Sequence, residues 1–168
     1  MVNSDRQEIF SYRSDPEICK YQSWKPISID DVDEFISTKI VSEPNIPGSW
    51  MQFAICLRAT HQLIGDCGIH FLENEPEQVE VGITIKKLFQ GRGYASEALT
   101  TVFNYIFFDL KKHRIVASID PENFASIRLM EKMNMCKEAH FRKSIWMNEN
   151  WVDDVVYAIL AEEWAPKN

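Results

Sequence analysis

The chain has 168 residues, 45% of them hydrophobic and 26% charged, and this balance predicts one soluble globular domain spanning residues 1–168. Its net charge of -7 argues against a nucleic-acid-binding protein, because contacts to phosphate need a basic surface. No apolar run approaches the roughly 18 residues of a membrane span, and the polar first residues are unlike a signal peptide, so we expect a cytoplasmic protein without membrane contact.

The first fifty residues are predicted to be mainly helical. Residues 5–13 form a short helix that Ser14-Asp15-Pro16 ends, and a further helical turn follows at 17–21. Ser28 is a good N-cap for a helix over residues 29–40, whose apolar residues fall on one face. Residues 42–49, with two prolines and a glycine, form a linker too short to divide domains.

Three antiparallel strands are predicted next. Apolar and polar residues alternate from Met51 to Arg58, the turn follows at 59–62, and the chain returns over 63–71. An acidic loop then leads to a third strand at 79–85. In that strand an apolar set alternates with a polar or small set, namely Val79, Val81, Ile83 and Ile85 with Glu80, Gly82 and Thr84.

The second half alternates helices and strands. A helix with one apolar face covers 93–110, and a buried strand covers 114–119. Asn123 caps a second helix of about three turns, which Asn134 ends in a left-handed conformation. A final hairpin pairs two strands, 137–146 and 151–160, around the turn Met147-Asn148-Glu149-Asn150.

The four cysteines are scattered, without a Cys-x-x-Cys pair or a histidine cluster at metal-ligand spacing. We therefore expect no metal site, and free thiols of the kind found in a reducing cytoplasm. Cys56 and Cys67 could face each other across the first hairpin, but burial as small hydrophobic residues is the expected role.

A glycine-rich hexapeptide, Gln90-Gly91-Arg92-Gly93-Tyr94-Ala95, joins the third strand to the long helix. Its glycines allow a tight turn, and the unpaired N–H groups at the start of a helix can bind phosphate. A Walker loop would need Lys after Gly93, and the dinucleotide fingerprint would need Gly or Ala where the chain has Ser96. An ordinary strand-to-helix turn is a further alternative for the hexapeptide alone.

The pattern Gln90-x-x-Gly93-x-Ala95 resembles the acetyl-CoA pyrophosphate loop of the GNAT N-acetyltransferases. The resemblance covers most of the chain and is closest to the RimJ/RimL-like branch, the ribosomal-protein alanine/serine N-acetyltransferases. Its most specific blocks are His113-Arg114-Ile115 and residues 123–133 at their mutual spacing. It implies an α+β GNAT fold, with a mixed, mostly antiparallel sheet and helices on both faces.

One departure concerns the start of the fold. In this branch a first strand precedes the initial helix, whereas here the helix begins within a few residues of Met1. Either that strand is very short, or the natural start lies upstream, or another chain covers the exposed sheet edge. The oligomeric state, monomer or homodimer, is therefore left open.

The resemblance also implies a binding site for acetyl-CoA. The N–H groups of the loop would hold the pyrophosphate, with Gln90 shaping the turn and Arg92 adding charge. The extended pantetheine arm would pair with the end of the third strand, and Asn123 would touch it from the second helix. The residues expected to contact the cofactor are Ile83, Thr84, Ile85, Gln90, Gly91, Arg92, Gly93, Tyr94, Ala95 and Asn123.

Acetyl transfer to an amine needs a general base, because the amine arrives protonated. Glu80 matches the family's base position, and a solvated strand carboxylate is its alternative role. Many GNAT enzymes protonate the leaving thiolate with a Tyr seven residues after the Asn, where this chain has Met130. The RimL-like arrangement uses a Ser three residues after the Asn, which is Ser126 here, and local helix capping is its alternative role.

We therefore expect an acetyl-CoA:amine N-acetyltransferase that acts by direct attack in a ternary complex. The acceptor, a small molecule or a protein N-terminus, is not readable from the sequence. Five aromatic residues near element ends could line its pocket or pack in the core, namely Tyr12, Trp24, Trp50, Trp146 and Trp151. The alternative from another class is a CoA-binding regulatory or assembly module that lacks turnover.

Overall fold

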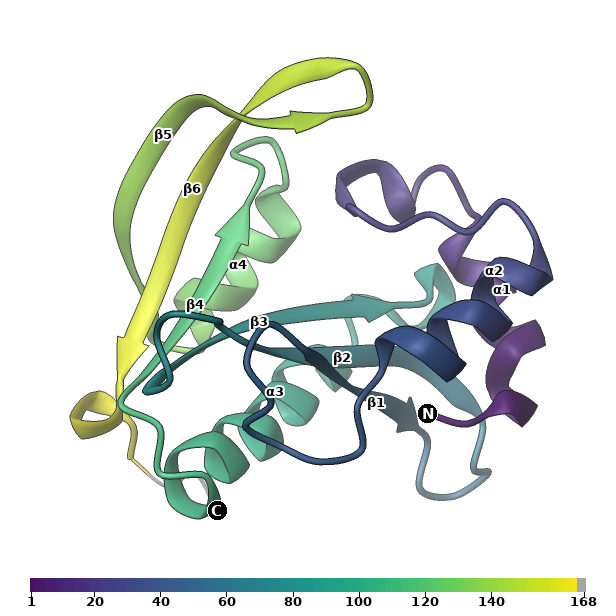
Figure 1. The fold of residues 1–168 in the computed structure, drawn as a ribbon, viewed down its shortest axis with the longest axis horizontal. Coiled ribbons are helices and arrows are strands. Elements are labelled where there is room, and N and C mark those ends of the chain that lie inside the picture. Colours follow the sequence, from purple (N-terminus) through teal and green to yellow (C-terminus); the bar gives the residue numbers. More distant parts are fainter. Residues whose placement is uncertain (166–168) are drawn as a thin grey trace.

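The computed structural model describes residues 1–165 and contains one six-stranded sheet, ordered β1-β2-β3-β4-β6-β5 (Figure 1). Two helices precede the sheet and two more follow its third and fourth strands. The elements in chain order are α1 (Arg6–Arg13), α2 (Ile29–Glu34), β1 (Trp50–Cys56), β2 (Leu63–Phe71), β3 (Gln78–Ile85), α3 (Tyr94–Asn104), β4 (Arg114–Ile119), α4 (Phe124–Lys132), β5 (Cys136–Met147) and β6 (Asn150–Leu160). None of the helices in this described part is long and apolar enough to cross a bilayer.

The predicted elements are confirmed with small changes at their ends. The helices expected at 29–40 and 93–110 both end in a π-helical turn, at Phe35–Lys39 and Tyr105–Asp109. Asn134 has the expected left-handed backbone, with φ +63°. The hairpin turn is also confirmed, since Asn148 and Glu149 both have positive φ, as a two-residue turn of the primed type requires.

The sheet is mixed, because one of its neighbouring pairs, β3 with β4, is parallel and the others are antiparallel. The parallel pair is short, and its register ends where Glu80 faces Val116. Beyond this point β3 continues to Ile85 and β4 to Ile119 without pairing with each other, although each stays paired with its other neighbour, β2 or β6. Figure 1 shows the result as two arms, β1 to β3 and β4 to β6, that diverge from this point. We call it the fork.

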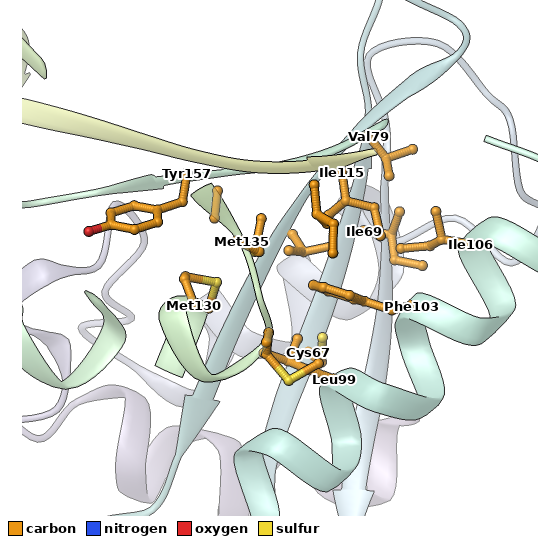
Figure 2. Close-up of a cluster of buried hydrophobic side chains, with 14 of the residues drawn as sticks. Cys67, Ile69, Val79, Leu99, Phe103, Ile106, Ile115, Met130, Met135 and Tyr157 are labelled. Atoms are coloured by element: carbon orange, nitrogen blue, oxygen red, sulfur yellow. The ribbon is translucent and has the colours of Figure 1, made fainter. Parts of the chain in front are cut away.

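The main core lies on the face of the sheet that α3 and α4 cover. Leu99, Phe103 and Ile106 of α3 are fully buried against strand residues such as Ile69 and Ile115. Figure 2 shows these side chains together with Met130 of α4, so residues from both arms share one apolar cluster. The apolar set of the alternating strands accounts for this face.

The opposite face of β1 to β3 carries the polar set of the strands, and α1 and α2 pack on the part of it around Asp66. Its centre is the carboxylate of Asp66, which is fully buried and forms an ion pair with the Arg13 guanidinium. Tyr12 and Gln52 also donate hydrogen bonds to this carboxylate. Burial raises the pKa of Tyr12 far above its usual range, and the neighbouring carboxylate raises it further. The network joins α1 to the sheet.

The first strand of the sheet, β1, is an edge strand. Apart from a bridge between Ile40 and Trp50, no other strand within residues 1–165 pairs with its outer side. A groove of about 830 Å³ runs beside this edge, between β1 and α3. It lies on the apolar face, and none of the proposed catalytic residues lines it. Cys56 is exposed here and Cys67 is buried, so burial is confirmed only for Cys67, and the register places neither opposite the other.

Candidate active site

The glycine-rich loop leaves the end of β3 and opens α3. The Gln90 side chain donates to the carbonyl of Ile85 at 2.8 Å, which ties the loop to the strand as expected. Gly91 and Gly93 have φ values of +73° and +88°, in the left-handed region that favours glycine. A Cβ at either glycine would meet nothing within 4 Å, so the loop backbone is open to a ligand.

The start of α3 offers unpaired donors. Gly93 is the N-cap, and Glu97 is the first residue whose N–H reaches an acceptor one helical turn back, the Gly93 carbonyl at 3.1 Å. The N–H groups before it have no acceptor within the helix and lie at its positive end. The loop residues from Gly91 to Ala95 thus lie at the positive end of α3, and the N–H groups of a helix start can bind phosphate.

Besides Arg92 of the loop, a second cationic side chain, Lys132, lies beside the start of α3, and the sequence alone did not predict this position. Lys132 of α4 donates to the Ser96 hydroxyl at 3.1 Å, and that hydroxyl donates to the Gly93 carbonyl at 2.9 Å. A hollow of about 240 Å³ lies between the two helices at this point. Because Ser96 and Lys132 are 36 residues apart, only the packing of α3 against α4 brings them together.

The fork separates the expected cofactor residues into two groups. Ile83, Thr84 and Ile85 lie on β3 beyond its last pairing with β4, so one side of this strand is open to another extended chain. The Thr84 hydroxyl is buried and has no hydrogen-bond partner in the described part of the chain. Asn123 and Ser126 lie together at the start of α4, after β4.

Asn123 and Ser126 share the capping of α4 in a defined way. The Asn123 side-chain oxygen accepts the Ser126 N–H at 3.2 Å, so the predicted N-cap is confirmed. The Ser126 hydroxyl itself makes no hydrogen bond within residues 1–165. Local capping therefore does not occupy this hydroxyl, which is left available as a donor.

Glu80 occupies the vertex of the fork. It is the last residue of β3 that pairs with β4, and its side chain is 29% exposed on the polar face. Its carboxylate Oε2 lies 3.4 Å from His70 Nδ1 on β2. The carboxylate is therefore partly buried and paired, unlike a fully solvated strand residue. His70 has no counterpart among the sequence predictions.

The segment between α1 and α2 crosses the fork. Glu17 pairs with Lys87, just after β3, whereas the Tyr21 hydroxyl lies 3.3 Å from the Glu122 carbonyl before α4. Farther along, the Lys25 ammonium lies 2.8 Å from the Asn148 side-chain oxygen at the hairpin turn. The segment thus contacts both arms and covers the polar side of the opening.

The aromatic residues considered for an acceptor pocket have different fates. Tyr12 is buried in the Asp66 network, and Trp24 stacks on Phe35 with ring centroids 4.1 Å apart. Trp146 and Trp151 contact each other on the exposed hairpin. Trp50 stacks on His70, whose ring faces Glu80.

Comparison with known proteins finds similarity to acetyltransferases. A family model described as an acetyltransferase (GNAT) domain matches residues 1–136. The uncharacterized N-acetyltransferase YnaD of Bacillus subtilis is 33% identical over 160 residues, covering 95% of this chain and 90% of the relative. The ribosomal protein uS5-alanine N-acetyltransferase of Escherichia coli is 30% identical over 86 residues, which is 51% of this chain and 44% of that enzyme.

Solved structures give the same fold. The crystal structure of a GNAT-family acetyltransferase from Bacillus anthracis superposes with a TM-score of 0.83 at 30% identity, covering 97% of this chain and 93% of the other. The spermidine N-acetyltransferase from Vibrio cholerae, in complex with CoA and spermine, also reaches 0.83 at 21% identity, covering 97% and 94%. The second likeness is one of fold.

Proposed function

Since the chain belongs to the GNAT acetyltransferase family and is therefore an acyltransferase, we propose that it transfers the acetyl group of acetyl-CoA to a primary amine by direct attack in a ternary complex. The observation that carries this proposal is the fork in the sheet beside an open, glycine-rich helix start. Residues 1–168 would act as one acetyltransferase domain, as a monomer or a homodimer, without nucleic acid.

We propose that acetyl-CoA, the acetyl donor, binds in the fork between β3 and β4, with its pyrophosphate at the glycine-rich loop. The N–H groups from Gly91 to Ala95, with Gln90 and Arg92, would hold the pyrophosphate, and the bare backbone at both glycines fits such a ligand. The open side of Ile83–Ile85 would pair with the amides of the pantetheine arm. The Asn123 amide N–H₂ is not used in capping and would donate to the same arm. When bound, acetyl-CoA supplies an activated thioester carbonyl.

The chain's own residues would then move two protons. Glu80 would accept the proton of the acceptor ammonium, directly or through one water, so that the neutral nitrogen can attack. The free hydroxyl of Ser126 would protonate the sulfur that leaves and would be reprotonated, through water, by the second proton that the acylated nitrogen loses. The products are then the amide, the CoA thiol and the one proton held by Glu80, which passes to solvent. The segment covering the fork would limit access of bulk water on the acceptor side.

The acceptor class is proposed from relatives alone. The RimJ/RimL-like branch is supported by the E. coli relative, whose name gives a ribosomal-protein alanine as acceptor. The Vibrio structure has a polyamine bound, which makes small amines the other class to test. Both carry a primary amine, whose neutral nitrogen can attack the thioester carbonyl directly.

Two measurements test the proposal. Calorimetric titration of the purified protein should detect CoA, and neither ATP nor NAD should compete with it. Gly93→Val should weaken CoA binding at least tenfold, because it adds bulk to the open backbone, whereas Gly48→Val is the matched control at another exposed, positive-φ glycine. Thioester consumption is then measured with spermidine and with N-terminal peptides of ribosomal proteins. CoA binding without consumption across the panel would indicate a binding module, and no CoA binding would refute the donor site.

A further inference from the structure

His70 and Glu80 form a cross-strand pair on the polar face of the sheet. The two residues are directly opposite each other in the β2–β3 register. His70 Nδ1 lies 3.4 Å from Glu80 Oε2, and the side chains are 24% and 29% exposed. This distance is longer than a strong hydrogen bond, but catalytic hydrogen bonds in ligand-free sites are often long and tighten with substrate.

The His70 ring is itself held from the other side. Trp50, its register partner on β1, stacks on it with ring centroids 4.7 Å apart and planes within 3°. Room for the indole comes from Gly68, where a Cβ would lie 2.8 Å from Trp50 Cε3. Three neighbouring strands thus place Trp50, His70 and Glu80 in one row that ends at the vertex of the fork.

We propose that His70 is a positioning residue for the Glu80 carboxylate, with Trp50 fixing the His70 ring; this rests on the function proposed above. With the Nδ1–H of His70 donating to Oε2, the other oxygen, Oε1, is left to face the acceptor amine. No other hydrogen bond to this carboxylate occurs within residues 1–165. A Glu side chain has several freely rotating bonds. A contact from His70 to one carboxylate oxygen restricts Glu80 to fewer orientations, so its other oxygen faces the amine more of the time.

The chain offers a second histidine–carboxylate pair for comparison. His140 Nε2 lies 2.8 Å from Asp153 Oδ2 on the exposed β5–β6 hairpin. There the carboxylate also accepts the Lys143 backbone N–H at 2.9 Å, so the pair stabilises a local bulge. This pair lies outside the fork and supplies a matched control.

Steady-state kinetics test the positioning role. His70→Ala should lower kcat about ten- to hundredfold and leave the KM for acetyl-CoA unchanged, because the donor site is not touched. His70→Gln keeps an N–H donor of similar reach and should recover most of the lost kcat. Trp50→Leu should reproduce the His70→Ala defect in kcat, and His140→Ala should match the wild type. A wild-type kcat in His70→Ala, or a His70→Gln variant as slow as His70→Ala, would overturn the proposal.

Nitrogen NMR gives a readout independent of turnover. At a pH where His70 is neutral, its ring should carry the proton on Nδ1, and Glu80→Ala should shift the population toward the Nε2–H form. An Nε2–H ring in the wild-type protein would refute the contact. Because this result does not depend on acetyl-CoA, failure of the positioning role is distinguishable from failure of the proposed function.

Discussion

The two faces of β1, β2 and β3 differ in chemistry although the same strands build both. One face presents buried side chains such as Ile69 and Val79 to α3. The other carries Asp66, which Tyr12 of α1 contacts, and the pair of His70 and Glu80. The apolar face contributes packing that tolerates similar shapes, whereas the polar face depends on individual hydrogen-bond partners. Stability on the polar face is concentrated near Asp66, and the proposed chemistry is concentrated at Glu80.

The largest effect on stability is expected at the centre of the polar face. Asp66→Ala leaves the Arg13 guanidinium buried without its partner and should lower the free energy of unfolding by about 3–5 kcal/mol. Urea denaturation measures this change. Glu138→Ala breaks the exposed pair with Arg114 and should cost less than about 1 kcal/mol. Equal losses in the two variants would mean that burial of the Asp66 pair has no special role.

On the apolar face, truncation should cost somewhat less. Ile69 is fully buried between the sheet and α3, so Ile69→Ala should lower the free energy of unfolding by about 2–5 kcal/mol. Leu88→Ala removes a similar side chain that is 71% exposed, and a change within about 0.5 kcal/mol is expected. A change as small as that of Leu88→Ala in the free energy of unfolding of Ile69→Ala would show that Ile69 is not part of the main hydrophobic core.

Gly68 tests the packing of the polar face. A Cβ at this position would lie 2.4 Å from Gln52 Oε1 and 2.8 Å from Trp50 Cε3. Gly68→Ala should therefore destabilise the protein by about 1–3 kcal/mol and reduce kcat, since both the Asp66 network and the Trp50 stack are displaced. Gly82→Ala is the control, because the nearest atom to its Cβ would be 4.0 Å away. Equal stability in the two variants would contradict the tight packing at Gly68.

Alkaline pH should weaken the polar face selectively. The pKa of Tyr12 is raised by burial and by Asp66, so the folded protein keeps the phenol neutral while the unfolded chain ionises above about pH 10. The stabilising contribution of neutral Tyr12 is complete below that pH and should fall by about 1.4 kcal/mol per pH unit above it. Unfolding curves between pH 8 and 11 measure this slope. Tyr12→Phe should remove that part of the slope, and an unchanged slope would show that other groups cause it.

The smallest effect on stability is expected at Glu80. Its carboxylate is partly exposed and has one long contact, so Glu80→Gln should change the free energy of unfolding by less than about 0.5 kcal/mol. The same substitution should lower kcat about a hundredfold if Glu80 is the base. A stable Glu80→Gln variant with undiminished kcat would show that Glu80 is not the general base.

Much of this organisation follows from local patterns. The period-two alternation from Val79 to Ile85 predicts which side chains face α3, and the Asn123 cap predicts where α4 begins. The glycine-rich loop predicts the helix start because its backbone conformation needs glycine. These features involve residues close together in the chain, so the sequence carries enough information for them.

The remaining features depend on contacts between distant residues. Arg13 and Asp66 are 53 positions apart, and neither is marked by a local pattern as a buried ion pair. His70 reads as an ordinary polar strand residue until the register places it opposite Glu80. The same holds for Ser96 and Lys132, which meet only through helix packing. Register and helix packing are set by the whole core, so local periodicity cannot supply them.

The short contact between β3 and β4 has a consequence for how the two arms stay attached. Backbone hydrogen bonding across the middle of the sheet is almost interrupted, yet Phe103, Ile115 and Met130 belong to one continuous hydrophobic layer underneath. Cohesion across the molecule therefore depends on side chains of α3 and α4 rather than on the strand ladder. A break in the hydrogen bonding of a sheet would ordinarily weaken a protein of this size. Here the hydrophobic core shared by both arms holds the two halves of the sheet together.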